Sequence, residues 1–145
     1  MGIDVFIDTL RFIMDSIRAY WRKYSRYEDV DNIIPYLWIG SERHNSHKWN
    51  EVDTRCIKEG GMPTKKQIKK LLKQADIVNH PGHTLVFCRM GRSRSAMIVI
   101  LYLVSIGWKL EDAIELVKSE RKFIHFNKKQ RRFLNDYTQT KRKHV

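Results

Sequence analysis

Residues 85–104 constrain the fold of this chain more than any other stretch. An apolar run ending at Cys88 is followed by a short polar loop and then by a second apolar run, Ala96–Val104. The first run has the length of a buried strand, and the second has the length of a buried helix. Between them, Cys88–Ser95 supplies one cysteine, one glycine, three arginines and two serines. The stretch predicts a loop between a central strand and a buried helix, with groups suited to hold a phosphate dianion over a thiolate.

Cys88 and Arg94 stand in a C-x5-R arrangement directly before the predicted helix. The N-terminus of a helix offers unpaired N–H groups and the positive end of the helix dipole to an anion. Gly91 permits a backbone turn that a side chain would resist, and Arg94 can bind two phosphate oxygens at once. The same positive field favours the nucleophilic thiolate of Cys88, and Ser95 can hydrogen-bond to it. These residues predict attack on a phosphate monoester, a phosphocysteine intermediate and the need for a general acid.

The remaining sequence predicts an α/β fold with a small central sheet flanked by helices. Thr64 and Gln67 have the spacing of a capping box, and Gly107 follows the buried helix as a C-terminal cap. Apolar periodicity predicts a helix over residues 4–24, two strands around a turn within 30–40, a weak strand over 52–57, a strand over 84–87, and helices over 65–78, 110–120 and 128–138.

Composition narrows the class of partner. The chain has 145 residues, enough for one domain, and a formal net charge of +12, which favours phosphoproteins, nucleic acid or an anionic membrane surface. Cys56 and Cys88 lack the spacing of a zinc site, and we expect reduced thiols in an intracellular protein, although a single disulfide is compatible with the sequence. His44 and His47 are assigned to a solvated loop rather than to a metal site. No apolar run is long enough to span a bilayer.

The segment VFCRMGRSRS resembles the active-site loop of the dual-specificity branch of the cysteine-dependent protein-tyrosine phosphatases. Tyr27–Ser41 resembles the opening strands of that family, Gly61–Thr64 the segment after its general acid, and Gly107–Asn127 the helix after the catalytic one. The resemblance covers most of residues 27–137. It implies a phosphatase-like catalytic domain in 27–140 with a mixed sheet. Apolar periodicity places an N-terminal amphipathic helix in the preceding residues 1–26, and a run of basic residues forms a tail in 141–145.

The resemblance also implies a role for individual residues. Cys88 is the expected nucleophile, Arg94 binds phosphate, Ser95 assists breakdown of the intermediate, and Glu59 occupies the place of the general acid. The family needs no metal and no organic cofactor for this chemistry, so none is expected. The backbone cradle for the phosphate is expected from Arg89, Met90, Gly91, Arg92 and Ser93.

Three features depart from the family pattern. Glu59 replaces an aspartate, which leaves Asp53 as a second candidate acid, and Phe87 replaces the histidine that usually precedes the cysteine. The segment between Ser41 and Glu59 is shorter than the family's helix and strand require. The expected activity is hydrolysis of phosphotyrosine and phosphoserine/threonine in proteins. The alternatives are a phosphate-binding module without turnover, and a phosphatase acting on phosphoinositides or RNA 5′-phosphates.

Two arginines of the loop bear on that choice. Arg89 and Arg92 are either exposed loop charges or contacts for a polyanionic substrate such as an anionic lipid or RNA. We expect a monomer that does not bind DNA specifically. We expect it in the cytoplasm, with the nucleus or the membrane surface as alternatives.

Overall fold

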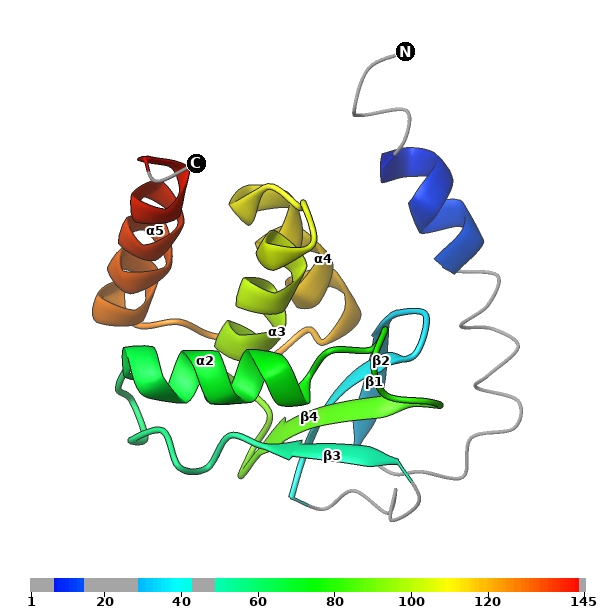
Figure 1. Cartoon of the computed structure of the whole chain (residues 1–145), viewed down its shortest axis with the longest axis horizontal. Coiled ribbons are helices and arrows are strands. Elements are labelled where there is room, and N and C mark those ends of the chain that lie inside the picture. Colours follow the sequence, from blue (N-terminus) through cyan, green and yellow to red (C-terminus); the bar gives the residue numbers. More distant parts are fainter. Residues whose placement is uncertain (1–6, 15–28, 43–48, 144–145) are drawn as a thin grey trace.

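A computed structural model of the chain describes residues 7–14, 29–42 and 49–143, without the side chains of 140–143 (Figure 1). Residues 7–14 are helical, while the rest of the predicted N-terminal helix, together with His44 and His47, lies outside the described residues. The other elements are β1 Val30–Ile34, β2 Leu37–Ser41, β3 Asn50–Asp53, α2 Lys65–Gln74, β4 Thr84–Cys88, α3 Arg94–Ser105, α4 Leu110–Glu120 and α5 Lys128–Lys143.

The four strands form one mixed sheet in the order β1-β2-β4-β3. β1 pairs with β2 in antiparallel fashion, and β4 runs parallel to both of its neighbours, β2 and β3. Ser41 pairs with Cys88, and Asp53 pairs with Phe87, so the carboxyl ends of the three parallel strands meet at one edge. This is the edge at which α/β folds place their ligands. The predicted α/β class and mixed sheet are confirmed.

The helices cover one face of this sheet (Figure 1). The main hydrophobic core lies between them and the strands, and it includes the inner side chains of α3 from Ala96 to Leu103. A smaller cluster of Trp38, Leu85 and Phe87 lies on the opposite face, as the period of two in a strand requires. Because β4 is buried on both faces, it reads in the sequence as a continuous apolar run.

The two helix caps predicted from the sequence are present, because each depends on residues that are close together in the chain. The capping box at α2 is formed: Thr64 Oγ1 accepts from the Gln67 N–H at 3.1 Å, and Gln67 Oε1 accepts from the Thr64 N–H at 2.9 Å. Gly107 follows α3 with a φ of 112°, as a C-terminal cap requires.

Element ends moved by a few residues. α2 ends at Gln74, before the predicted Val78, because Asp76 Oδ1 accepts from the Val78 N–H and closes a turn there. The weak strand predicted over 52–57 is β3 and lies earlier, at Asn50–Asp53. It supplies a sheet strand within the short segment before Glu59. α5 continues to Lys143, through the first residues of the predicted basic tail.

Candidate active site

Cys88 is the last residue of β4, and the loop after it turns back over the cysteine sulfur. The Gly91 N–H donates to Cys88 Sγ at 3.2 Å, and Ser95 Oγ lies 3.3 Å from the same sulfur. Gly91 has a φ of 65°, which is the left-handed conformation that its role in the loop predicted. The thiol is buried, with 2% of the residue exposed. The loop therefore surrounds the sulfur with donors rather than with apolar groups.

This environment changes the acidity of the thiol. Burial of Cys88 acts to raise its pKa, because a thiolate is poorly solvated inside the protein. Hydrogen bonds from the Ser95 hydroxyl and from the backbone N–H groups of Ser95, Gly91 and Arg92 stabilise the thiolate and outweigh burial, so the pKa lies below that of an ordinary thiol. The lowered pKa is reached with Phe87, rather than histidine, before the cysteine.

Arg94 is the first residue of α3, and its side chain is held close to the Cys88 loop by backbone carbonyls. It is only 8% exposed, and its Nη1 donates to the carbonyl oxygens of Ile57 at 3.1 Å and Arg55 at 3.4 Å. These two carbonyls fix one edge of the guanidinium, which narrows the orientations it can take. A fixed guanidinium is the group expected to bind two oxygens of a phosphate.

A cavity of about 220 Å³ brings the predicted residues together. Glu59 lies in its wall with Cys88 and Arg94, although 29 residues separate Glu59 from Cys88 in the sequence. The complete lining is Glu59, Gly60, Cys88, Met90, Arg92, Ser93, Arg94, His125, Asn127 and Gln130.

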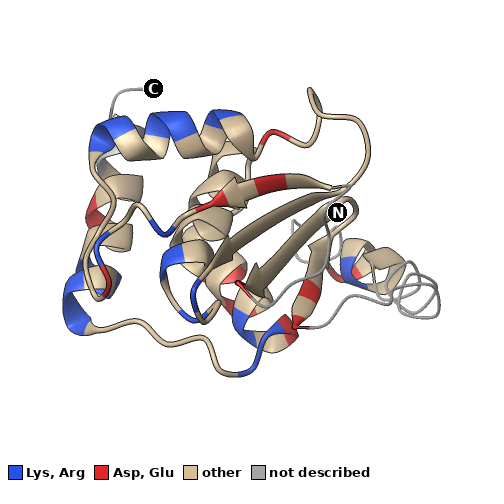
Figure 2. Cartoon of the chain, turned by 90° about the horizontal axis from the view of Figure 1, so that it is seen from below, with Lys and Arg blue, Asp and Glu red and all other residues tan. Residues whose placement is uncertain are grey.

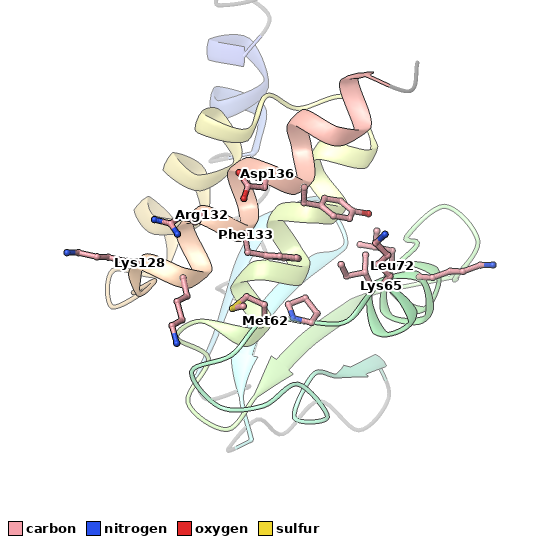
Figure 3. A pocket seen from close by; sticks show the side chains of 12 residues that line it. Met62, Lys65, Leu72, Lys128, Arg132, Phe133 and Asp136 are labelled. Carbon is pink, nitrogen blue, oxygen red and sulfur yellow. The ribbon is translucent and has the colours of Figure 1, made fainter.

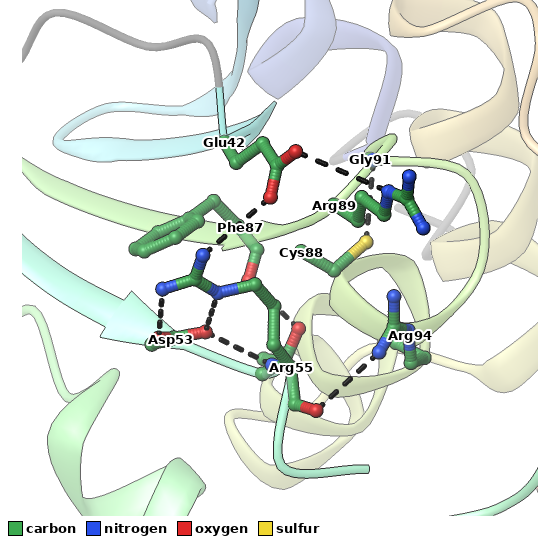
Figure 4. Close-up of polar contacts among 9 residues, drawn as sticks. Glu42, Asp53, Arg55, Phe87, Cys88, Arg89, Gly91 and Arg94 are labelled. Carbon is green, nitrogen blue, oxygen red and sulfur yellow. Dashed lines mark hydrogen bonds and ion pairs between the residues drawn. The ribbon is translucent and has the colours of Figure 1, made fainter. Parts of the chain in front are cut away.

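Asp53, the second candidate acid, is engaged elsewhere (Figure 4). Its Oδ2 lies 2.7 Å from Arg55 Nη2, and its Oδ1 accepts from Arg55 Nε at 2.9 Å. The hydrogen bonds from Arg55 lower the pKa of the Asp53 carboxyl, which therefore stays ionised near neutral pH. Asp53 does not line the cavity, so the geometry favours Glu59 as the acid.

Arg89 and Arg92, the two other arginines of the loop, lie in different surroundings. Arg89 is exposed and its Nε lies 4.0 Å from a carboxylate oxygen of Glu42, whereas Arg92 lines the cavity. Arg55 also reaches Glu42, at 3.5 Å, and its guanidinium lies 5.3 Å from the centre of the Phe87 ring (Figure 4). The Phe87 ring thus packs against the Arg55 guanidinium. Arg92 therefore lies at the cavity, whereas the Arg89 side chain lies beside Glu42.

Arg121 binds the backbone of the loop between β4 and α3, a role that the sequence did not reveal. It is 1% exposed, and it forms ion pairs of 2.9 Å with both Asp29 and Asp31. Its Nε donates to the Gly91 carbonyl at 2.8 Å, and its Nη2 donates to the Met90 carbonyl at 3.1 Å. The two aspartates on either side of Val30, at the start of β1, were the signal that could have revealed it.

Gly91 also lies where there is no space for a side chain. A Cβ added there would lie 2.7 Å from the Gly40 carbonyl oxygen and 2.6 Å from Arg121 Nη2. Both contacts are closer than van der Waals distance. Glycine at this position therefore serves the turn and also the approach of Arg121.

Residues at the start of α5 hold the segment that carries Glu59, a role that the sequence did not reveal. Asn127 Nδ2 donates to the Gly60 carbonyl at 2.9 Å, and Gln130 Nε2 donates to the Gly61 carbonyl at 3.1 Å. Asn127 and Gln130 also cap α5 reciprocally, since each side chain accepts from the backbone N–H of the other. The helix start and the acid segment are therefore fixed as one unit.

The structure also bears on disulfides, metal sites and membrane-spanning helices. Both cysteines are free, with Cys56 exposed and Cys88 buried. Within residues 7–14, 29–42 and 49–143, no three histidine, cysteine or carboxylate side chains cluster as a metal site would require. In the same part of the chain, no helix has the length and apolar character needed to cross a membrane.

A strand, an anion-binding loop and a buried helix, with a cysteine, an arginine and a carboxylic acid in one cavity, define the class of cysteine-dependent phosphatases. The sequence model for "Dual specificity phosphatase, catalytic domain" matches residues 30–140. The chain belongs to the dual specificity phosphatase family, and the resemblance seen in the sequence is confirmed.

Individual proteins agree with this assignment. The chain is 36% identical over 92 residues to the probable protein tyrosine phosphatase type IVA B of Dictyostelium discoideum, which covers 60% of this chain and 56% of that protein. The chain thus spans about half the length of that relative.

Two solved structures share the fold. Human DUSP28 carrying Y102H is 19% identical, with a TM-score of 0.70 over 81% of this chain and 99% of that one. PTPMT1 in complex with PI(5)P is 18% identical, with a TM-score of 0.61 over 80% and 96% of the two chains.

Proposed function

We propose that this protein hydrolyses phosphate monoesters of phosphorylated proteins through a phosphocysteine formed on Cys88. One observation carries the proposal: Glu59 and Arg94 line the same cavity as a Cys88 sulfur that is contacted by Ser95 Oγ and the Gly91 N–H. A lowered thiol pKa agrees with it, because the thiolate is the nucleophilic form.

In the first step the Cys88 thiolate attacks phosphorus, and the bond between phosphorus and the ester oxygen breaks. The Glu59 carboxyl gives its proton to the leaving oxygen, so an alcohol or phenol departs and a phosphocysteine remains. Arg94 and the N–H groups at the start of α3 stabilise the negative charge of the transferring group.

In the second step water attacks phosphorus, and the bond between phosphorus and sulfur breaks. The Glu59 carboxylate takes the proton of the water, and inorganic phosphate leaves. The sulfur departs as a thiolate, to which the Ser95 hydroxyl at 3.3 Å donates a hydrogen bond. The enzyme returns to its starting state without metal or redox cofactor.

The mouth of the cavity suits a phosphorylated side chain on a peptide. Met90 is 55% exposed and Arg92 is also exposed, and both line the cavity. They offer one apolar and one cationic contact to residues around the phosphorylated position. The name of the Dictyostelium relative, a probable protein tyrosine phosphatase, supports the same substrate class.

Hydrolysis of p-nitrophenyl phosphate tests the chemistry. We expect turnover by the wild type and no measurable turnover by Cys88→Ser. Cys56→Ser is the matched control, since Cys56 is a free, exposed thiol that does not line the cavity, and it should retain wild-type activity. Activity that survives in Cys88→Ser would reject a cysteine-based mechanism.

A substrate panel tests the substrate class. Phosphotyrosine and phosphoserine peptides are compared with PI(5)P and with RNA bearing a 5′-phosphate, at equal concentration of scissile phosphate. We expect the highest kcat/KM with a phosphopeptide. A higher value with PI(5)P or RNA would replace the protein substrate with that class. Binding of phosphopeptide without turnover of any substrate would identify a phosphate-binding module.

A further inference from the structure

A groove of about 1000 Å³ lies between α2 and α5, outside the catalytic cavity (Figure 3). We call it the α2–α5 groove. Met62 in it is 40% exposed, and Ile68 lies almost fully buried at its base. Apolar surface left open in this way is typical of sites that bind another molecule. The apolar part of the groove consists of Met62, Pro63, Ile68, Leu72, Phe133 and Tyr137.

Each of the two helices that form the walls of the groove carries basic residues spaced four residues apart. Lys65 and Lys69 are one turn apart on α2, and Lys128 and Arg132 are one turn apart on α5, with Lys129 beside them. A separation of four residues along a helix is about 6 Å. Carboxylates at the same four-residue spacing on a bound helix would therefore meet cations on both walls.

These cations are exposed and remain available. Among the described residues, none of Lys65, Lys69, Lys128, Lys129 or Arg132 forms an ion pair with a carboxylate. Among the described residues that line the groove, Asp136 is the only acidic one. Figure 2 shows the basic residues repeated along α2. The groove is thus complementary to an occupant that combines an apolar stripe with negative charge on either side.

One end of the groove reaches the catalytic machinery. Met62 and Pro63 directly follow Glu59–Gly61, the segment that carries the expected acid. At the same end, Asn127 and Gln130 bind the carbonyls of Gly60 and Gly61 from the start of α5. An occupant of the groove consequently lies beside the catalytic cavity.

We propose that the α2–α5 groove docks an acidic amphipathic helix of a phosphorylated protein substrate. The part that concerns a substrate rests on the proposed phosphatase function; the docking of an acidic helix does not. Helices bind apolar grooves through residues at i, i+3, i+4 and i+7, and the apolar part of this groove offers that stripe a surface. A lipid would place one headgroup at one end of the groove and leave the second turn of cations on each wall unmatched.

Fluorescence anisotropy with a designed probe tests the proposal. The probe is a fluorescein-labelled helical peptide with leucine and phenylalanine along one stripe and glutamate on both flanks. Lys65→Glu/Lys69→Glu reverses one wall. Lys66→Glu/Lys70→Glu makes the same charge change on the same helix, at exposed positions outside the groove lining, and is the matched control.

We expect the groove variant to weaken binding of the probe by about tenfold, the effect of losing two exposed ion pairs. The control variant should change it by less than about twofold. Met62→Ser should also weaken binding, whereas Val78→Ser, at an apolar position that is 84% exposed and outside the groove, should not. Equal losses in both charge variants, or tighter binding of a peptide with lysine in place of glutamate, would overturn the proposal.

Sedimentation with lipid vesicles tests whether the groove binds a membrane surface instead of a protein helix. Sedimentation with phosphatidylcholine–phosphatidylserine vesicles that is lost in the groove variant and kept in the control, without binding of the peptide, would also overturn the proposal. Binding of the probe needs no turnover. A protein that binds the probe through the groove but hydrolyses no phosphate ester keeps the docking site and loses the proposed function, and the reverse result removes the docking site alone.

Discussion

Replacing Arg121 with methionine tests the account of the loop, because methionine keeps much of the length of the side chain and removes its charge. Arg121 is 1% exposed and connects Asp29 and Asp31 to the carbonyls of Met90 and Gly91. The change removes the ion pairs of Arg121 with both carboxylates and its hydrogen bonds to both carbonyls.

The magnitude follows from burial. Removing one partner of a buried ion pair costs about 3–5 kcal/mol. The Asp29 and Asp31 side chains are 35% and 32% exposed, so water can resolvate them in part. Loss of the hydrogen bonds to the two carbonyls adds to the cost. We expect a decrease of about 3 kcal/mol in the free energy of unfolding, which is within the stability of a typical domain.

Urea denaturation measures this loss against a control. Arg131→Met removes an ion pair of 2.7 Å to Glu111, in which the two side chains are 36% and 72% exposed. That variant should lose less than about 1 kcal/mol, as exposed pairs do. Alkylation of Cys88 by iodoacetamide adds a readout for the loop, since displacement of Gly91 should move the reactivity of the thiol to higher pH. Equal losses in the two variants, with unchanged alkylation, would refute the role given to Arg121.

Three further predictions concern the site and the fold. Glu59→Gln should lower kcat for a phosphotyrosine peptide by roughly 100-fold and Asp53→Asn by much less; the reverse order in steady-state kinetics would move the acid to Asp53. Ser95→Ala removes a hydrogen bond that lowers the pKa of Cys88, so alkylation should require higher pH than in the wild type, and an unshifted profile contradicts that cause. Thr64→Ala should lower the free energy of unfolding by about 1 kcal/mol through loss of the capping box, and urea denaturation without a change would show that the cap is dispensable.

The part of the site that the sequence predicted is local in the chain. Cys88, Gly91, Arg94 and Ser95 act within one strand–loop–helix unit, so the apolar runs on either side were enough to place them. The α/β class followed from the order of the predicted strands and helices, whereas the mixed sheet was implied by the family resemblance. The end of α2 did not follow, because a turn at Asp76 decides it, and α5 continues beyond the predicted end at residue 138.

The missed residues act across long separations in sequence. Arg121 contacts Gly91 over 30 residues and Asp29 over 92 residues, which no periodicity reveals. Asn127 reaches Gly60 over 67 residues. The choice between Glu59 and Asp53 is an intermediate case. Packing brought Glu59 to the cavity, but Arg55 stands two residues from Asp53, and that pair was a local sign that Asp53 is occupied.

The phosphocysteine is the central claim, and trapping it is the most direct test. Glu59→Gln should slow hydrolysis of the intermediate more than its formation from p-nitrophenyl phosphate, whose leaving group needs little protonation. A denaturing alkaline quench preserves the bond between phosphorus and sulfur, and peptide mass spectrometry then locates the phosphoryl group. The account predicts one phosphoryl group on Cys88 and none on Cys56. A burst of p-nitrophenol with the phosphoryl group on another residue, or with an unmodified Cys88, would contradict it.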